Sequence, residues 1–453
     1  MRSYWLVTTL VISGCALESE PRATGLEPAP PSQHAETMLA PGVDQVTPLG
    51  SLAELEQLAL SRHGDLARLR LEQHALEASA AGQKAWPNPR LTYREYLIEV
   101  ETRVGPQERA FGIEQPIPWP GALDHRSDRA MRQAEGVGFQ RIERSRQILS
   151  HVRALWAEYF YLGRAIEVRR ESLELLERLE QAANDRLSAG RGTTSQVLQI
   201  QVEKARLEND LRSMVDRVRP LESALRAETG EPVTRSLRFP DRLESRPPHP
   251  ADPDAIRAAF VSSDAMLARA DAEIRVAESD LDLASYEGWP KLGVGIQTVI
   301  TGNAIQPGVR GSGDDPWIVG VTLEVPLDRR RPRAAKRVAR DRLAAAHASR
   351  GQLERERLAA LDEALFRRAD SLRRVDLYTE TLIPKGEESL GALEVAYTGG
   401  TGDVSDLLDA ERVLLEFRLG LARAESDRLS AEARLRAFLG ETASTPTEER
   451  GSP

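Results

Sequence analysis

The sequence predicts a mainly α-helical protein with a small β part, built from two similar halves. Segments 190–230 and 400–440 align without a gap at an offset of 210 residues (400 − 190 = 210). Two long segments, 124–188 and 333–398, contain at most one proline each, which favours very long helices. Between helical segments the hydrophobic period changes from about 3.6 to 2, which indicates strands.

The offset alignment matches turn residues as well as apolar ones. Coinciding pairs include Gly190 with Gly400, Gly192 with Gly402, and Gly230 with Gly440. Chance similarity between two helices would match apolar positions but would rarely match these glycines too. The pattern therefore indicates an internal duplication.

The start of the chain is typical of an exported bacterial lipoprotein. Residues 1–14 are predicted as a signal peptide, because their apolar run is too short to span a bilayer. Cys15, the only cysteine among 453 residues, stands where a lipobox requires it and is the predicted lipidation site. Segment 15–50 is rich in Pro, Glu and Ala and is predicted as a lipidated tether.

The first half, residues 51–230, is predicted to run helix, hairpin, long helix, turn, helix. Its strands are expected at about 90–100 and 109–119, each long enough to cross a bilayer when tilted. The following helix, from about 124 to 188, would be on the order of 100 Å long. Such a length suits a coiled coil or a helical tunnel rather than a globular domain.

The second half, residues 254–440, repeats this plan after a proline-rich linker at 231–253. Its strands are expected at about 291–301 and 316–326. The tail at 441–453 is predicted to be disordered.

The four predicted strands are too few to form a closed β-barrel from one chain. No apolar run reaches the roughly 18 residues that a spanning helix needs, so strands are the candidates for entering a bilayer. Four strands cannot close, since small closed barrels need about eight, so several copies would have to share one barrel. Trp86, Trp119 and Trp289 stand at strand-to-helix switches and form a predicted interfacial aromatic girdle; ordinary core packing is the alternative.

Composition and motifs do not favour catalysis or nucleic-acid binding. The net charge is −9, and no nucleic-acid partner is expected. The seven histidines are dispersed, and no zinc motif, nucleophile elbow or phosphate loop is found. The protein is therefore predicted to be no enzyme, with no cofactor and no metal site.

Three acids follow the second glycine turn. Asp403, Asp406 and Asp409 are spaced by three residues on overlapping faces of a helix start. Asp403 is the expected N-cap, and the helix dipole favours acids there. That effect fades after the first turn, so it explains Asp406 less well and Asp409 poorly.

The turn also carries a family resemblance. Tyr397, Gly400, Thr401, Asp406 and Asp409 stand as they do in the TolC-like outer-membrane efflux proteins, and the motif GIEQPIPWPG at 112–121 resembles the heavy-metal cation-efflux branch. The resemblance covers about residues 51–440. It implies a homotrimer in the outer-membrane lipid of a Gram-negative bacterium, with a twelve-stranded β-barrel continued by an α-helical tunnel.

The resemblance further implies a function. The chain would be the passive exit duct of a tripartite efflux system, with a periplasmic adaptor and an inner-membrane pump of the RND class as partners. A periplasmic gate would be formed by Tyr397, Asp403, Asp406 and Asp409. The adaptor-docking turns would contain Gly190, Gly192, Gly399, Gly400 and Gly402. Relatives often have arginine where Gly402 stands, which leaves the latch of the closed entrance open.

Three alternatives remain at the level of sequence. A periplasmic adaptor lipoprotein also has a helical hairpin, but with lipoyl-like and small β-barrel domains around it. A cell-wall hydrolase with a coiled-coil arm would need a catalytic domain that no segment supplies. The cargo can be metal cations or, as in multidrug channels, organic compounds.

Overall fold

The computed structural model describes residues 51–230, 237–240 and 253–440. The predicted signal peptide, Cys15, the tether, most of the linker and the tail lie outside the described residues.

The first half contains four helices and two strands. Ser51 caps the first helix by accepting a hydrogen bond from the Glu54 amide, and Thr193 forms a capping box with Gln196 at the start of the fourth. The helices are α1 (Leu52–Arg62), α2 (Gly64–Gln83), α3 (Ala122–Ser188) and α4 (Thr194–Thr229), and the strands are β1 (Arg90–Val100) and β2 (Gln107–Ile117).

The second half repeats this order with one addition. A π-helical turn, η1 (Tyr378–Leu382), stands directly before Pro384, whose missing amide interrupts the regular ladder. The elements are α5 (Pro253–Ser263), α6 (Ala265–Tyr286), β3 (Lys291–Thr301), β4 (Trp317–Glu324), α7 (Arg330–Leu377), η1, α8 (Ile383–Thr398) and α9 (Val404–Leu439).

The four strands form one antiparallel sheet in the order β1-β2-β3-β4. The two hairpins are joined because β2 pairs with β3 along nearly its whole length. β2 was expected at 109–119 but ends at Ile117, since Pro118 and Pro120 cannot donate ladder hydrogen bonds. β4 was expected at 316–326 and is shorter for the same reason, with Pro316 and Pro326 at its borders.

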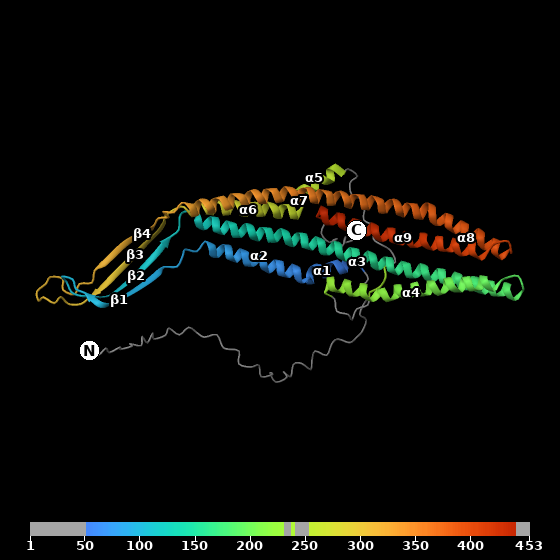
Figure 1. Cartoon of the computed structure of the whole chain (residues 1–453), viewed down its shortest axis with the longest axis horizontal. Coiled ribbons are helices and arrows are strands. Elements are labelled where there is room, and N and C mark those ends of the chain that lie inside the picture. Colours follow the sequence, from blue (N-terminus) through green and yellow to red (C-terminus); the bar gives the residue numbers. More distant parts are fainter. Residues whose placement is uncertain (1–50, 231–236, 241–252, 441–453) are drawn as a thin grey trace, which may run out of the picture. The chain divides into compact units, whose positions relative to one another are not determined.

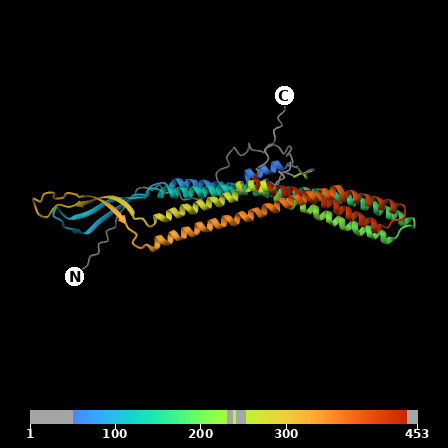
Figure 2. The same cartoon turned by 90° about the horizontal axis from the view of Figure 1, so that it is seen from above.

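The helices pack beside one another between the sheet and the two glycine turns (Figures 1 and 2). Near the turns, α3, α4, α8 and α9 enclose one apolar cluster, which includes Leu176, Ile200, Tyr397 and Leu407. A second cluster joins α1, α3, α4 and α9 around Trp156. A third joins α5, α7 and α9 around Phe260. The core is thus a row of separate clusters along the helices.

The two turns have the same backbone geometry. Gly190 and Gly400 have φ of 67° and 86°, a region that glycine adopts at little cost. The amide of Gly190 donates to the carbonyl of Leu187, and the amide of Gly400 donates to that of Tyr397, at 3.0 and 3.1 Å. Leu187 and Tyr397 are themselves 210 residues apart, so the duplication extends to individual hydrogen bonds.

Candidate functional site

The sheet has one apolar face that is exposed in the single chain. The register aligns Leu91, Ile113, Ile296 and Val319 as direct partners across all four strands. All four side chains are exposed, by 40% at Ile296 and 81% at Leu91. A continuous exposed apolar row of this kind marks a surface that contacts lipid or another protein.

The opposite face is mostly polar or small, with Val299 and Ile318 as apolar exceptions. The neighbouring row aligns Arg90, Glu114, Gly295 and Gly320, because adjacent residues of a strand point to opposite faces. A side chain added at Gly320 would meet no atom within 4 Å. The sheet therefore separates an apolar side from a polar side, with β1 and β4 as edges that have one neighbour each in the described residues.

Two of the three predicted girdle tryptophans contact each other where the strands meet the helices. The rings of Trp119 and Trp289 lie 5.0 Å apart, edge to face, and Trp119 Nε1 donates to the carbonyl of Pro290 at 2.6 Å. Tyr286 packs on Trp289 at 5.2 Å. Trp86 is exposed and makes no ring contact within the described residues.

The glycine turns are fixed by close backbone approach. A Cβ on Gly402 would lie 2.8 Å from the Tyr397 nitrogen, and a Cβ on Gly192 would lie 2.9 Å from the Leu187 nitrogen. Backbone atoms cannot move aside as a flexible side chain can, so this turn excludes larger residues. An arginine at either position would not fit the turn as it stands.

Arg186 joins the two turns. Its guanidinium lies 4.6 Å from the centre of the Tyr397 ring, and its Nη1 donates to the Tyr397 carbonyl. The Tyr397 side chain is buried, its hydroxyl has no hydrogen-bond partner, and burial raises the pKa of this phenol. Arg186 was not among the predicted site residues. The 210-residue offset aligns it with Ala396, the neighbour of Tyr397, and this alignment is the signal that could have pointed to it.

The three predicted gate acids are all exposed at the start of α9. Asp403 occupies the N-cap position, but its side chain makes no capping hydrogen bond. Asp409 forms an ion pair with Arg412 at 2.9 Å, and Arg412 also binds Glu203 of α4 at 2.7 Å. Asp406 has no ion-pair partner among the described residues, so its charge is the less compensated of the two.

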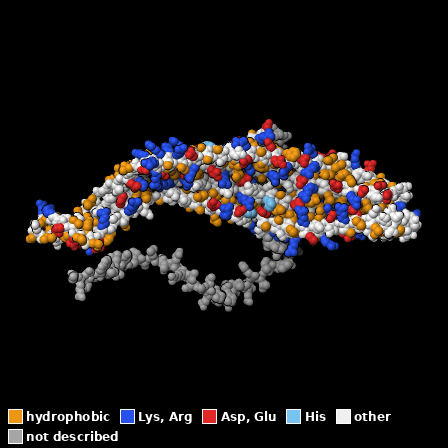
Figure 3. Space-filling view, viewed as in Figure 1, with side chains coloured by type: hydrophobic (Ala, Val, Ile, Leu, Met, Phe, Trp, Pro, Cys, Tyr) orange, Lys and Arg blue, Asp and Glu red, His pale blue; other side chains and the backbone are white. Residues whose placement is uncertain are grey.

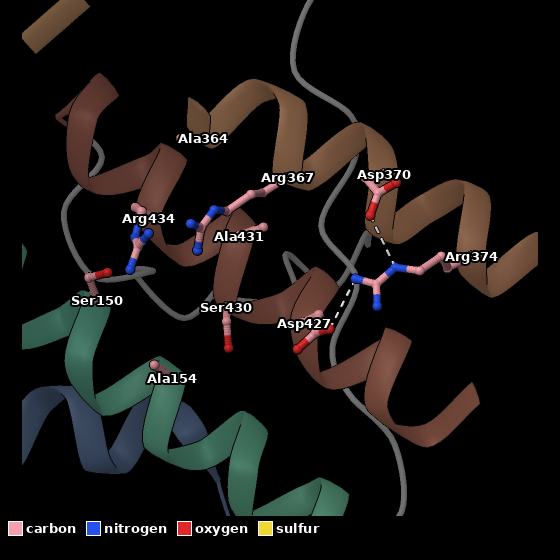
Figure 4. A pocket seen from close by; sticks show the side chains of 10 residues that line it. All are labelled: Ser150, Ala154, Ala364, Arg367, Asp370, Arg374, Asp427, Ser430, Ala431 and Arg434. Carbon is pink, nitrogen blue, oxygen red and sulfur yellow. Dashed lines mark hydrogen bonds and ion pairs between the residues drawn. The ribbon is translucent and has the colours of Figure 1, made fainter. Parts of the chain in front are cut away.

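A hollow between α3, α7 and α9, of about 330 Å³, is lined by charged side chains (Figure 4). Arg374 of α7 binds Asp370 on its own helix at 3.1 Å and Asp427 of α9 at 3.0 Å. Arg367 and Arg434 also line it. These contacts hold α7 against α9, which assigns the hollow a structural role.

The described residues contain neither a metal-binding cluster nor a membrane-spanning helix. No group of three or more His, Cys, Asp or Glu side chains could hold a metal ion in the described ranges. Within the same ranges, every helix is too short or too polar to serve as a transmembrane segment.

Comparison with known proteins identifies the architecture. The structure of the outer membrane protein VceC from Vibrio cholerae matches with a TM-score of 0.71 and 16% identity, over 87% of this chain and 97% of that one. The channel protein CusC matches at 0.73 and 14%, over 86% and 91%. The chain has the fold of TolC-like channels. The CmeC outer membrane channel of Campylobacter jejuni also matches, at 0.70 and 11%, over 86% and 85%.

A family model agrees for the second half. Residues 260–441 match the family described as outer membrane efflux protein. No curated protein matches the chain. These matches do not single out the heavy-metal branch.

Proposed function

We propose that this protein is the outer-membrane channel of a tripartite efflux system, a passive trimeric exit duct. The observation that carries the proposal is the sheet, which is apolar on one face, polar on the other and open at both edges. A sheet of this kind suits a shared barrel with lipid outside and water inside. The channel fold and the efflux-family match of residues 260–441 support the same function.

The assembly follows from the number of strands. One chain contributes four, whereas a closed barrel needs about eight or more, so edge β1 of one copy would pair with edge β4 of the next. Three copies would give twelve strands. Acylated Cys15 would add a lipid anchor at the outer membrane.

The partners would meet the helical end. We assign the periplasmic adaptor to the turns that contain Gly190, Gly192, Gly399, Gly400 and Gly402, and an inner-membrane RND pump would supply the energy. Close backbone contacts at Gly192 and Gly402 hold these turns in shape, which suits a docking tip of fixed shape.

The gate would lie beside these turns. Three copies of Asp406 and Asp409 would place six carboxylates around one entrance, the usual device of cation-selective pores. Asp403 would add exposed charge at the same helix start. Tyr397 would hold the turn in place from its buried position against Arg186.

Heavy-metal cations are the cargo we favour, because of the motif at 112–121 and the acids at the entrance. Organic compounds are the alternative, since the pump would select the substrate. The periplasmic-adaptor alternative is not favoured, because the described residues form two helical hairpins and one sheet rather than flanking small domains. A deletion strain tested against metal salts and against dyes separates the two cargos.

The test of the channel function uses the full-length protein purified in detergent. It should migrate as a trimer on gels without heating and should form ion-conducting pores in planar bilayers. A protein that remains in solution without detergent and gives no conductance would refute the proposal. In the same preparation, intact mass should show acylation at the mature N-terminus, and Cys15→Ser should abolish it while trimers still form.

A further inference from the structure

The start of α7 carries a dense group of basic residues. Segment 329–342 contains eight Arg or Lys residues and one acid, Asp341. Arg333, Lys336, Arg337 and Arg340 are spaced by three or four residues and form one stripe on the helix. All four are exposed, and Figure 3 shows Lys and Arg side chains gathered where α7 begins near the sheet.

These cations take little part in holding the chain together. In the described ranges, Arg330 pairs with Asp328 at 3.9 Å, and the four residues of the stripe have no ion pair. Farther along α7 the situation differs, because Arg350 and Arg357 bind acids of α6 and its N-cap. Eight cations with so little compensation repel one another and create a positive potential, which favours an anionic partner from outside the chain.

The stripe lies where the apolar face of the sheet ends. Val325 and Leu327, which join β4 to α7, are 46% and 89% exposed, and the basic residues follow directly. A hollow of about 730 Å³ at the same level has Trp119 and Trp289 in its wall. Its lining includes three basic residues, Arg126, Lys291 and Arg342, and two acidic ones, Asp280 and Glu287. Exposed apolar residues and cations therefore meet at one boundary, whereas the hollow lies on the opposite face of α7, which Ala335, Val338 and Ala339 line.

We infer that this boundary binds anionic glycerophospholipids of the leaflet next to the helical part of the protein. The phosphate groups would contact the stripe, whose arginines can bind phosphate through two N–H groups at once. The acyl chains would lie against the exposed apolar residues Val325 and Leu327, which directly precede the stripe. Clusters of four to eight Lys or Arg beside a membrane-inserted segment bind anionic lipid in this way. The inference rests on the proposed membrane function.

The experiment compares lipid binding by two charge-matched variants. Purified full-length trimers in a nonionic detergent are titrated with fluorescent phosphatidylglycerol and, separately, with phosphatidylcholine. Arg333→Gln, Arg337→Gln and Arg340→Gln, combined, should weaken phosphatidylglycerol binding at least tenfold at low salt. Wild-type affinity should fall steeply as NaCl is raised, because screening acts on exposed charges.

The control removes three positive charges elsewhere. Arg206, Arg212 and Arg219 are exposed on α4, the helix that follows the first glycine turn. Their combined change to Gln should alter phosphatidylglycerol affinity less than twofold. A third variant, with Lys at positions 333, 337 and 340, keeps the charge and should retain the preference for phosphatidylglycerol over phosphatidylcholine.

Several results would overturn the inference. One is an equal loss of phosphatidylglycerol affinity in the two Gln variants, and another is equal wild-type affinity for the two lipids. A third is loss of the preference for phosphatidylglycerol in the Lys variant. A fourth is displacement of the lipid by inorganic phosphate at equal phosphate concentration. Loss of trimers in the α7 Gln variant would instead assign the stripe to contacts between copies. If the wild type conducts ions but shows no lipid preference, this inference fails while the proposed function stands; absence of conductance refutes the proposed function itself.

Discussion

The assignment of the two sheet faces can be tested with one pair of neighbouring substitutions. Val321 is the fifth of eight residues of β4, so it lies near the middle of the strand, and its side chain is 73% exposed on the apolar face opposite Val294. Gly320, the preceding residue, belongs to the polar face, and an added side chain there meets no atom within 4 Å. The two positions would therefore lie at about the same depth in the bilayer but on opposite faces of the sheet.

An arginine at Val321 should destabilise the inserted protein by about 2–4 kcal/mol per chain, the cost of a lipid-facing arginine near the bilayer midplane. At 1.4 kcal/mol per tenfold, this is a change of about 30- to 700-fold in the folding equilibrium. Gly320→Arg should cost less than about 1 kcal/mol, because its charge would remain in water.

The assay is denaturant unfolding of the full-length protein in phospholipid vesicles, followed by tryptophan fluorescence. Conductance of each variant in planar bilayers serves as the check that it assembles. An equal cost at both positions would show that the sheet does not separate lipid from water. A larger cost at Gly320 would show that the faces are reversed.

The turns and the entrance give three further predictions. Asp406→Asn should reduce cation-over-anion selectivity in planar bilayers more than Asp409→Asn, because only Asp409 is paired with an arginine; equal effects would contradict this. Arg186→Ala should destabilise the paired turns by about 1.5–3 kcal/mol, because a charge-assisted hydrogen bond is lost. The measurement is amide hydrogen exchange in the two turns, which should become faster. Unchanged exchange would contradict this prediction. Gly402→Ala should cost about 1–3 kcal/mol by overpacking against the backbone, whereas Gly391→Ala, with open space in α8, should not lower the melting temperature.

The sequence alone determined the elements and their order. The change of period, the flanking prolines and the turn glycines act within a few residues of the backbone, so they can be interpreted without knowledge of the rest of the chain. The strand expected at 291–301 occupies those residues in the structure. The strand expected at 109–119 is shifted by two residues, because the sequence pattern did not weigh the prolines at its end.

Only the tertiary structure decided which residues meet across the two halves. β2 pairs with β3, Arg186 covers Tyr397, and Glu203 binds the same arginine as Asp409. These partners are separated by well over one hundred residues, and their contacts depend on how helices and strands pack rather than on local propensity. For the same reason the sequence placed Tyr397 among the gate residues without showing that its side chain is buried, since burial depends on elements far away in the chain.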